Sequence, residues 1–212
     1  MKLKQLMLPF RTRGGRRRGA GRPPNGKTAM VSHLKRPAFE KITPAHVTLR
    51  IANDIPSLRS SRRFQLIREC FAKAQRRPGM RLIEFSVLSN HLHLIVEADD
   101  SRELSRGMQG LCVRLARALN EALRRSGRVF ADHFHSQLLK SPTRLVNAIR
   151  YVLGNAEHHY GKAGADFFSS EAPGAAEVLV APLGWLLRDG WVRAPRQLRA
   201  RLSGIPRYAI AP

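Results

Sequence analysis

The stretch NHLHLIV, residues 90–96, decides the fold because it predicts a β-strand with two unlike faces. Side chains alternate along a strand, so its leucines and Val96 share the face that packs on a hydrophobic core. His91 and His93 then share the opposite face, two residues apart. Neutral imidazoles held this close together are suited to binding one divalent cation.

This histidine pair does not by itself establish a metal site. A bare His-x-His on a strand is more often two ordinary surface or hydrogen-bonded histidines. A second pair, His133 and His135, has the same spacing around Phe134. Which pair forms a metal site therefore depends on which pair lies beside another element that supplies the remaining residues of the site.

Hydrophobic periodicity predicts the elements on either side of this strand. Strands are expected from His46 to before Pro56, over 82–88, over 91–98 and over 128–139. Helices are expected over 58–75, from Asp100 to near Gly127, and from Ser141 to about Tyr160. The order β, α, β, β, α, β predicts an α+β, ferredoxin-like antiparallel sheet with two helices on one face. The third helix is then free to cover the open face.

The last predicted helix has one apolar and one polar side. Its apolar residues, among them Ile149 and Val152, fall in one arc, and Tyr151 and Asn155 fall in the opposite arc. Residues four apart on a helix are neighbours, so this phenol and this amide are expected side by side. A tyrosine used for packing belongs in the apolar arc, although a tyrosine that bridges to a neighbouring element remains an alternative.

The charge of the chain indicates a polyanionic partner. Its 212 residues include 38 Lys and Arg against 15 Asp and Glu, which gives a net charge of +23. No apolar stretch approaches the roughly 20 residues of a membrane-spanning helix, and no signal peptide is evident, so we expect a cytoplasmic, nucleoid-associated protein. Cys70 and Cys112 fall in apolar helical patterns and are expected to be reduced thiols.

Composition divides the chain into three parts. Residues 1–39 hold eleven Lys and Arg and no acidic residue, which predicts a flexible arm that tracks phosphates through Arg16, Arg17 and Arg18. A solubilising leader is the alternative. Residues 40–160 form the expected domain, and residues 161–212 are expected to pack on it as an appendage of unknown role.

Two motifs in this domain resemble those of a known family. The stretch from Asn90 to Val96 looks like the His-hydrophobic-His (HUH) motif of single-strand transposases. Residues 151–155, YVLGN, resemble the catalytic-helix motif of their branch of REP-associated tyrosine transposases. The two motifs stand in the right order and on the right elements, which is more specific than either alone. The resemblance covers about 46–160, and the chain departs from it at Ala156, where relatives often have proline.

The resemblance implies a metal-dependent DNA endonuclease and strand transferase with a single tyrosine. Tyr151 would be the nucleophile that forms a 5′-phosphotyrosine intermediate, and His91, His93 and the Asn155 carbonyl would hold Mg²⁺ or Mn²⁺. His133 and His135 would then act as support or as DNA contacts.

The expected substrate is single-stranded DNA, because an open sheet face crossed by one helix forms a groove for an extended strand. The resemblance adds hairpins formed by imperfect palindromes. Whether the active form is a monomer or a homodimer is left open. Besides the arm, the side chains expected to contact nucleic acid are Arg62, Arg63, His135 and Arg144.

Two other functions fit the same pattern. The first is a non-catalytic binder of the RNA-recognition type, which shares this sheet topology but stacks bases on aromatic side chains of its central strands. The second is a metal nuclease that uses water as the nucleophile, in which Tyr151 has a structural role.

Overall fold

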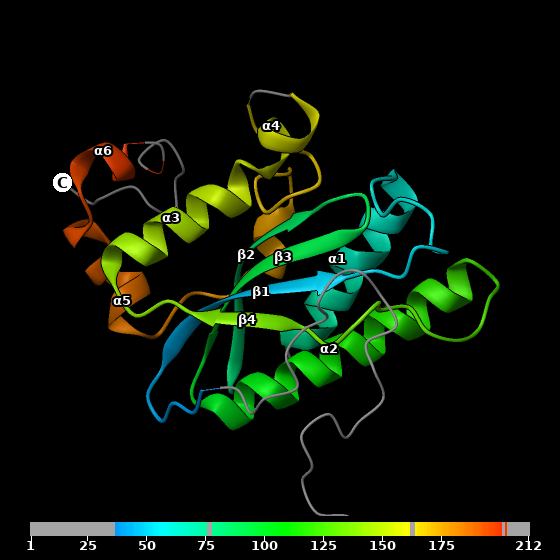
Figure 1. Ribbon diagram of the computed structural model, residues 1–212, viewed down its shortest axis with the longest axis horizontal. Coiled ribbons are helices and arrows are strands. Elements are labelled where there is room, and N and C mark those ends of the chain that lie inside the picture. Colours follow the sequence, from blue (N-terminus) through cyan, green and yellow to red (C-terminus); the bar gives the residue numbers. More distant parts are fainter. Residues whose placement is uncertain (1–36, 76–77, 162–163, 201, 203–212) are drawn as a thin grey trace, which may run out of the picture. The chain divides into compact units, whose positions relative to one another are not determined.

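A four-stranded antiparallel sheet lies at the centre of the computed structural model, which describes residues 37–75, 78–161, 164–200 and 202 (Figure 1). Its strands lie in the order β2-β3-β1-β4, which with the helices gives the predicted βαββαβ arrangement of a ferredoxin-like fold. The strands are β1 Thr43–Arg50, β2 Met80–Val87, β3 His91–Ala98 and β4 His135–Leu138. The predicted basic arm lies almost entirely outside the described residues.

Strand β3 has the bounds that its alternation predicts, and it lies between β1 and β2. Its register places His93 opposite Thr48 on β1 and opposite Ser86 on β2. Because paired residues point to the same face of a sheet, His93 lies in the middle of the face that carries these polar side chains.

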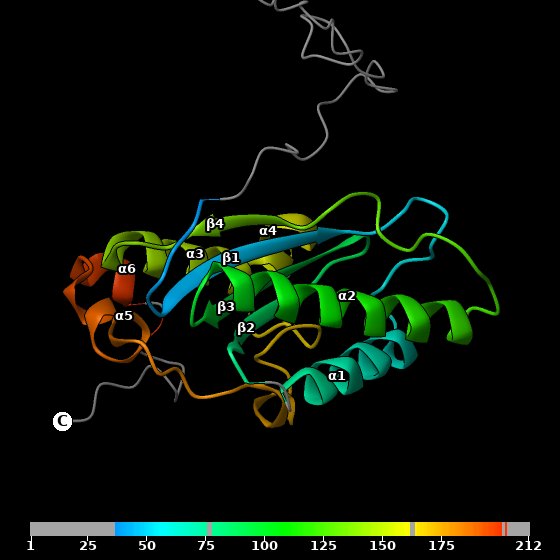
Figure 2. The same cartoon turned by 90° about the horizontal axis from the view of Figure 1, so that it is seen from below.

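Helices α1 and α2 cover the other face of the sheet, as predicted (Figure 2). They span Ser61–Gln75 and Ser101–Ala122. The predicted cap of α2 is confirmed, because the Asp100 carboxylate accepts the Glu103 N–H at 2.7 Å. Large apolar side chains fill the layer between helices and sheet, and Cys70 and Cys112 both carry free thiols. Among the fully buried are Leu49, Phe71, Phe85, Leu94, Met108 and Leu115.

Helix α3, Pro142–Leu153, packs on the polar face through a second apolar cluster. Its start is capped as predicted, since Ser141 Oγ accepts the Arg144 N–H at 3.3 Å. The apolar arc of the helix packs with Ile95 of β3. It also packs with Leu187 and Trp191, which belong to the C-terminal part of the chain. The short elements that follow α3 are α4 Asn155–Tyr160, η1 Ala175–Val178, α5 Trp185–Arg188, η2 Gly190–Arg193 and α6 Arg196–Arg199. In the described part of the chain, no helix is both long and apolar enough to cross a bilayer.

Two predicted elements are shorter in the structure. Strand β4 was expected over 128–139 but contains only His135–Leu138, with Phe130 joined to Ile51 by an isolated bridge. The stretch between them is not part of the ladder with β1, although Phe134 within it packs against the core. Helix α2 ends at Ala122, earlier than expected.

The prediction of one continuous helix from Ser141 to Tyr160 was wrong. The helix stops at Leu153, and Gly154 separates it from the short α4. Glycine has a low helix propensity, and a Cβ at position 154 would lie 2.9 Å from the carbonyl oxygen of Arg150. This break changes the direction of the chain immediately after Tyr151.

Residues between 168 and 180 bind to the outer edge of β2. Backbone hydrogen bonds join Val87 N–H to Phe168 O at 2.8 Å and Ser170 N–H to Phe85 O at 2.9 Å. Further along, the buried Glu97 carboxylate accepts the N–H groups of Leu183 and Gly184 at 2.8 and 2.9 Å. The segment therefore satisfies backbone groups that an open sheet edge would leave unpaired.

A buried ion pair fixes the start of this segment. Arg59 and Asp166 form a bidentate pair at 2.8 and 2.7 Å, with side chains only 12% and 4% exposed. The Arg59 guanidinium also lies over the rings of Tyr160 and Phe168, 4.5 and 4.4 Å from their centroids. One arginine therefore joins α4 and the residues that follow it to the rest of the domain.

Replacing Asp166 by alanine is expected to lower the free energy of unfolding by about 3–5 kcal/mol, because the change leaves the Arg59 charge buried and unpaired. Urea denaturation measures this. Asp54→Ala is the matched control, since its pair with Arg125 at 2.7 Å leaves Asp54 63% exposed and should contribute about 1 kcal/mol or less. Equal losses for the two variants would contradict the expected role of the buried pair.

Candidate active site

His93 is the central residue of the site and is 5% exposed. Its Nδ1 lies 3.0 Å from His46 Nε2 and 3.2 Å from Thr48 Oγ1, both on β1. Its Nε2 is buried and has no hydrogen-bond partner among the residues that the structure describes. Buried polar atoms are nearly always satisfied, so an orphaned ring nitrogen indicates a place for a ligand.

His91 lies beside His93, with the two ring centroids 4.8 Å apart. Its Nδ1 lies 2.7 Å from Asn90 Oδ1. A carbonyl oxygen only accepts hydrogen bonds, so the proton of His91 must be on Nδ1. The lone pair of Nε2 is then available to bind a cation.

Tyr151 projects from α3 to these histidines. Its ring centroid lies 5.2 Å from that of His93 and 5.7 Å from that of His46, with the rings edge to face. The side chain is still 46% exposed, so a substrate has access to it. The structure thus brings the tyrosine of the last core helix to the His91 and His93 pair, as the sequence predicted.

Asn155 is the first residue of the short helix α4, because the predicted continuous helix is interrupted at Gly154. Its side chain is fully buried. Its Nδ2 donates to Val152 O at 3.3 Å, and its Oδ1 is buried without a hydrogen-bond partner among the described residues. An amide oxygen that is dry and unpaired is a suitable cation ligand.

The contacts that α4 makes with the site were not predicted. The ring of His159 lies 5.8 Å from that of His91, and Tyr160 Oη accepts the backbone N–H of Ser89 at 3.0 Å. The sequence favoured a solvated surface for these residues as much as any role. These contacts place α4 against the turn between β2 and β3, directly beside His91.

His46 was also missed, although the alternation of β1 contained a signal. His46 and Thr48 are the polar members of the strand, so they share the face opposite the core. Their position beside His93 depends on the pairing of β1 with β3, which joins residues far apart in the chain. No local pattern specifies that register.

Burial keeps these imidazoles neutral. It lowers the pKa of His93 to about 3 and that of His46 to about 4, with further lowering by neighbouring histidines. Burial also lowers the pKa of His91, as do His159 and Arg50. A neutral imidazole is the form that binds a metal, so protons compete weakly for this site near pH 7.

Acid should destabilise the metal-free protein through the same groups. Below pH 6.5 the unfolded chain takes up protons on His46 and His93, whereas the folded state does not until about pH 4 and 3. Stability therefore falls as the pH falls through this window, by about 2 kcal/mol per histidine at pH 5. Urea denaturation at pH 7 and pH 5 measures the loss, and a variant carrying His46→Gln and His93→Gln should lose less. An equal loss in both proteins would show that other groups cause it.

The residues of the site fit a divalent cation. Two imidazole nitrogens and one amide oxygen form a mixed donor set of the kind that Mn²⁺ accepts. The tautomer of His91 leaves its Nε2 with a lone pair for the cation. His93 Nε2 and Asn155 Oδ1 are buried and have no hydrogen-bond partner among the described residues. No group of three His, Cys, Asp or Glu in the described part of the chain is arranged to hold a metal ion.

The predicted nucleic-acid contacts are dispersed. Arg16, Arg17 and Arg18 lie outside the described residues. His135 is exposed and pairs with Thr48, so it shares the face of the site, and Arg144 is exposed in the first turn of α3.

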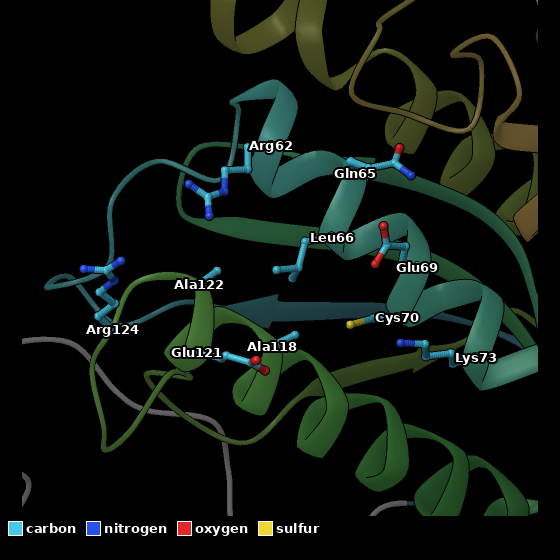
Figure 3. Close-up of a pocket in the computed structure, with 10 residues that line it drawn as sticks. All are labelled: Arg62, Gln65, Leu66, Glu69, Cys70, Lys73, Ala118, Glu121, Ala122 and Arg124. Carbon is cyan, nitrogen blue, oxygen red and sulfur yellow. The ribbon is translucent and has the colours of Figure 1, made fainter.

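Arg62 and Arg63 belong to α1, which covers the opposite face of the sheet. Arg62 lines a hollow of about 610 Å³ between α1 and α2, together with Lys73 and Arg124 (Figure 3). Arg63 Nε donates to Ser57 O at 2.5 Å. Neither arginine reaches the site of Tyr151, and any contact that they make with DNA would involve a separate surface.

The sequence of the chain matches one protein family over about half of its length. A sequence profile described as "Transposase IS200 like" matches residues 44–152, which is 109 of the 212 residues. The chain belongs to this family. The match includes the His91 and His93 pair and Tyr151 of this IS200-like transposase, and it ends before Asn155.

A solved structure has the same fold. A REP-associated tyrosine transposase bound to a REP hairpin is similar to this transposase with a TM-score of 0.55 and 17% identity, over 71% of this chain and 88% of that chain. A proposed transposase from Deinococcus radiodurans R1 is 14% identical with a TM-score of 0.41, over 52% of this chain and 89% of that chain. At these identities the similarity concerns the fold alone. No curated protein matches the transposase.

Proposed function

We propose that the transposase cuts and rejoins single-stranded DNA through a covalent link to Tyr151. The observation that carries this proposal is the half-exposed ring of Tyr151 at 5.2 Å from the ring of the buried His93. A tyrosine that only filled space would be buried in the apolar arc of α3. Instead it leaves that arc and lies beside His93, whose Nε2 has no hydrogen-bond partner among the described residues.

The reaction that fits this geometry is transesterification. The Tyr151 oxygen attacks the scissile phosphorus, the bond from phosphorus to the 3′ oxygen breaks, and the departing 3′ oxygen takes a proton. The product is a 5′-phosphotyrosine and a free 3′-hydroxyl, so the phosphodiester energy is conserved and rejoining needs no ATP. Mn²⁺ or Mg²⁺ held by His91, His93 and Asn155 would supply Lewis acidity at the phosphate. The chain itself orients the phenol and holds the ligands.

Access to the phenol supports an extended, unpaired substrate. Tyr151 opens on a hollow of about 510 Å³ at the junction of α3 and α4. Five of its six lining residues have a polar or charged side chain, which suits a nucleotide. The hollow is lined by Asn147, Arg150, Tyr151, Gly154, Glu157 and His158. We propose hairpin-bearing single-stranded DNA as the substrate, by analogy with the similar REP-associated transposase that was solved with a hairpin.

The RNA-recognition alternative is less well supported by the described residues. Such domains stack bases on aromatic rings of the central strands. Here the central strands β1 and β3 present His46, Thr48, His91 and His93 on that face. The water-using nuclease remains the competitor, because it needs the same cation and differs only in the nucleophile.

One assay separates the three functions. The protein is incubated with Mn²⁺ and a hairpin-bearing single strand labelled at either end, and the products are resolved in SDS. Our proposal predicts a protein–DNA adduct that keeps only the 3′-end label, together with a free fragment that ends in a 3′-hydroxyl. Cleavage without an adduct would favour the water-using nuclease, and binding without cleavage would favour the non-catalytic binder.

A further inference from the structure

The Nδ1 atom of His93 faces two side chains of β1. His46 Nε2 lies at 3.0 Å and Thr48 Oγ1 at 3.2 Å. The register places Thr48 directly opposite His93 and His46 two pairs further along, opposite Ile95 and on the same face of the sheet. Strand pairing therefore fixes both neighbours, independently of any loop.

Only one proton lies between the two rings, because a hydrogen bond between ring nitrogens 3.0 Å apart needs one donor and one acceptor. In the first arrangement His93 Nδ1–H donates to His46 Nε2, and His93 Nε2 carries a bare lone pair. In the second arrangement His46 donates, and His93 Nε2 carries a proton.

The surroundings of His93 Nε2 distinguish these arrangements. This atom is buried and has no hydrogen-bond partner among the described residues. A proton there would be a buried donor with nothing to accept it, whereas a lone pair there is ready for a cation. The first arrangement also gives the Nδ1–H two acceptors, since the Thr48 hydroxyl oxygen is within reach.

We propose that His46, assisted by Thr48, is a positioning residue that accepts the Nδ1–H of His93 and holds the ring in the tautomer whose Nε2 faces the cation. A hydrogen bond to the second nitrogen of a ligating histidine fixes the orientation of the ring and raises its basicity. The inference rests on the cation site of the proposed function.

His46 also contacts the nucleophile. Its ring centroid lies 5.7 Å from that of Tyr151, edge to face. The same imidazole therefore touches a cation ligand on one side and the tyrosine on the other. His46 thereby fixes the spacing between His93 and Tyr151, and it has no role in contacting the reacting phosphate.

The test compares three variants of the full chain without DNA. His46→Ala removes the acceptor, and Mn²⁺ affinity measured by calorimetry should fall about 10–100-fold. His46→Gln restores an acceptor near the position of Nε2 and should keep the affinity within about threefold of wild type. Gln137→Ala is the matched control, because Gln137 is exposed opposite His46 on β4 and should leave Mn²⁺ affinity unchanged.

A second readout reports the tautomer directly. Nitrogen-15 NMR of the metal-free protein, with His93 assigned from a His93→Gln variant, should show His93 protonated on Nδ1 in wild type and a mixture of tautomers in His46→Ala. This measurement needs neither metal nor DNA, so its result is independent of any failure of the nuclease proposal. Wild-type His93 protonated on Nε2, or undiminished Mn²⁺ affinity in His46→Ala, would overturn the inference. If His46→Ala does not fold, the wild-type tautomer and the affinity of His46→Gln decide.

Discussion

Replacing Tyr151 by phenylalanine should abolish the covalent adduct and reduce cleavage of hairpin-bearing single-stranded DNA by about 10³-fold or more. The change removes one oxygen atom from a ring that is 46% exposed, so the packing of α3 on the sheet is retained. Binding of DNA and of Mn²⁺ should persist, because the phenol is not among the proposed ligands. The adduct assay in SDS measures the loss, and thermal denaturation checks the fold.

Tyr160→Phe is the matched control for this experiment. It removes the same atom from a tyrosine that is 38% exposed and whose hydroxyl accepts the backbone N–H of Ser89 at 3.0 Å. Adduct formation should fall by less than about tenfold, because that hydroxyl holds α4 in place and performs no chemistry. An adduct that survives in Tyr151→Phe and disappears in Tyr160→Phe would assign the nucleophile to Tyr160.

Removing the His93 imidazole should have the second large effect. We expect His93→Ala to weaken Mn²⁺ binding by more than about 100-fold and to reduce DNA cleavage by about 10³-fold or more. The reason is that this change removes one of the two imidazoles that we propose as cation ligands. Calorimetry without DNA and the cleavage assay with saturating DNA measure the two losses separately.

His133→Ala provides the control, because it belongs to the second His-x-His pair with His135. His133 is exposed and precedes β4. The Mn²⁺ affinity of the His133→Ala variant should therefore stay within about twofold of wild type. A large loss of affinity in His133→Ala together with none in His93→Ala would move the cation to the second pair. Excess Mn²⁺ should restore part of the activity of a weakened site and none of the activity of Tyr151→Phe.

The features of the site that sequence alone predicted were those that depend on local periodicity. Alternation along β3 placed His91 and His93 on one face, and the observed strand has the predicted bounds. The helical period of α3 placed Tyr151 outside the apolar arc, where it lies in the structure. Both patterns are repeated several times within one element, so a single unusual residue does not obscure them.

The errors arose where a single residue or a distant pairing decides the outcome. Gly154, a residue of low helix propensity, separates α3 from α4, and the Asn155 that follows it is fully buried. A helical wheel assumes an unbroken helix, and on that assumption it placed Asn155 beside Tyr151 on the polar side. His46 lies beside His93 through the pairing of β1 with β3, which connects segments separated by more than forty residues.

The two apolar clusters on either side of the sheet affect how inactive variants should be interpreted. Helix α3 is held down by Leu187 and Trp191, more than thirty residues after Tyr151 in the sequence. A substitution such as Trp191→Ala would loosen the support of the nucleophile while the α1 and α2 layer stays intact, and a global melting curve could hide the change. Loss of transposition in such a variant would reflect a displaced phenol, and it would not mark Trp191 as a participant in the chemistry.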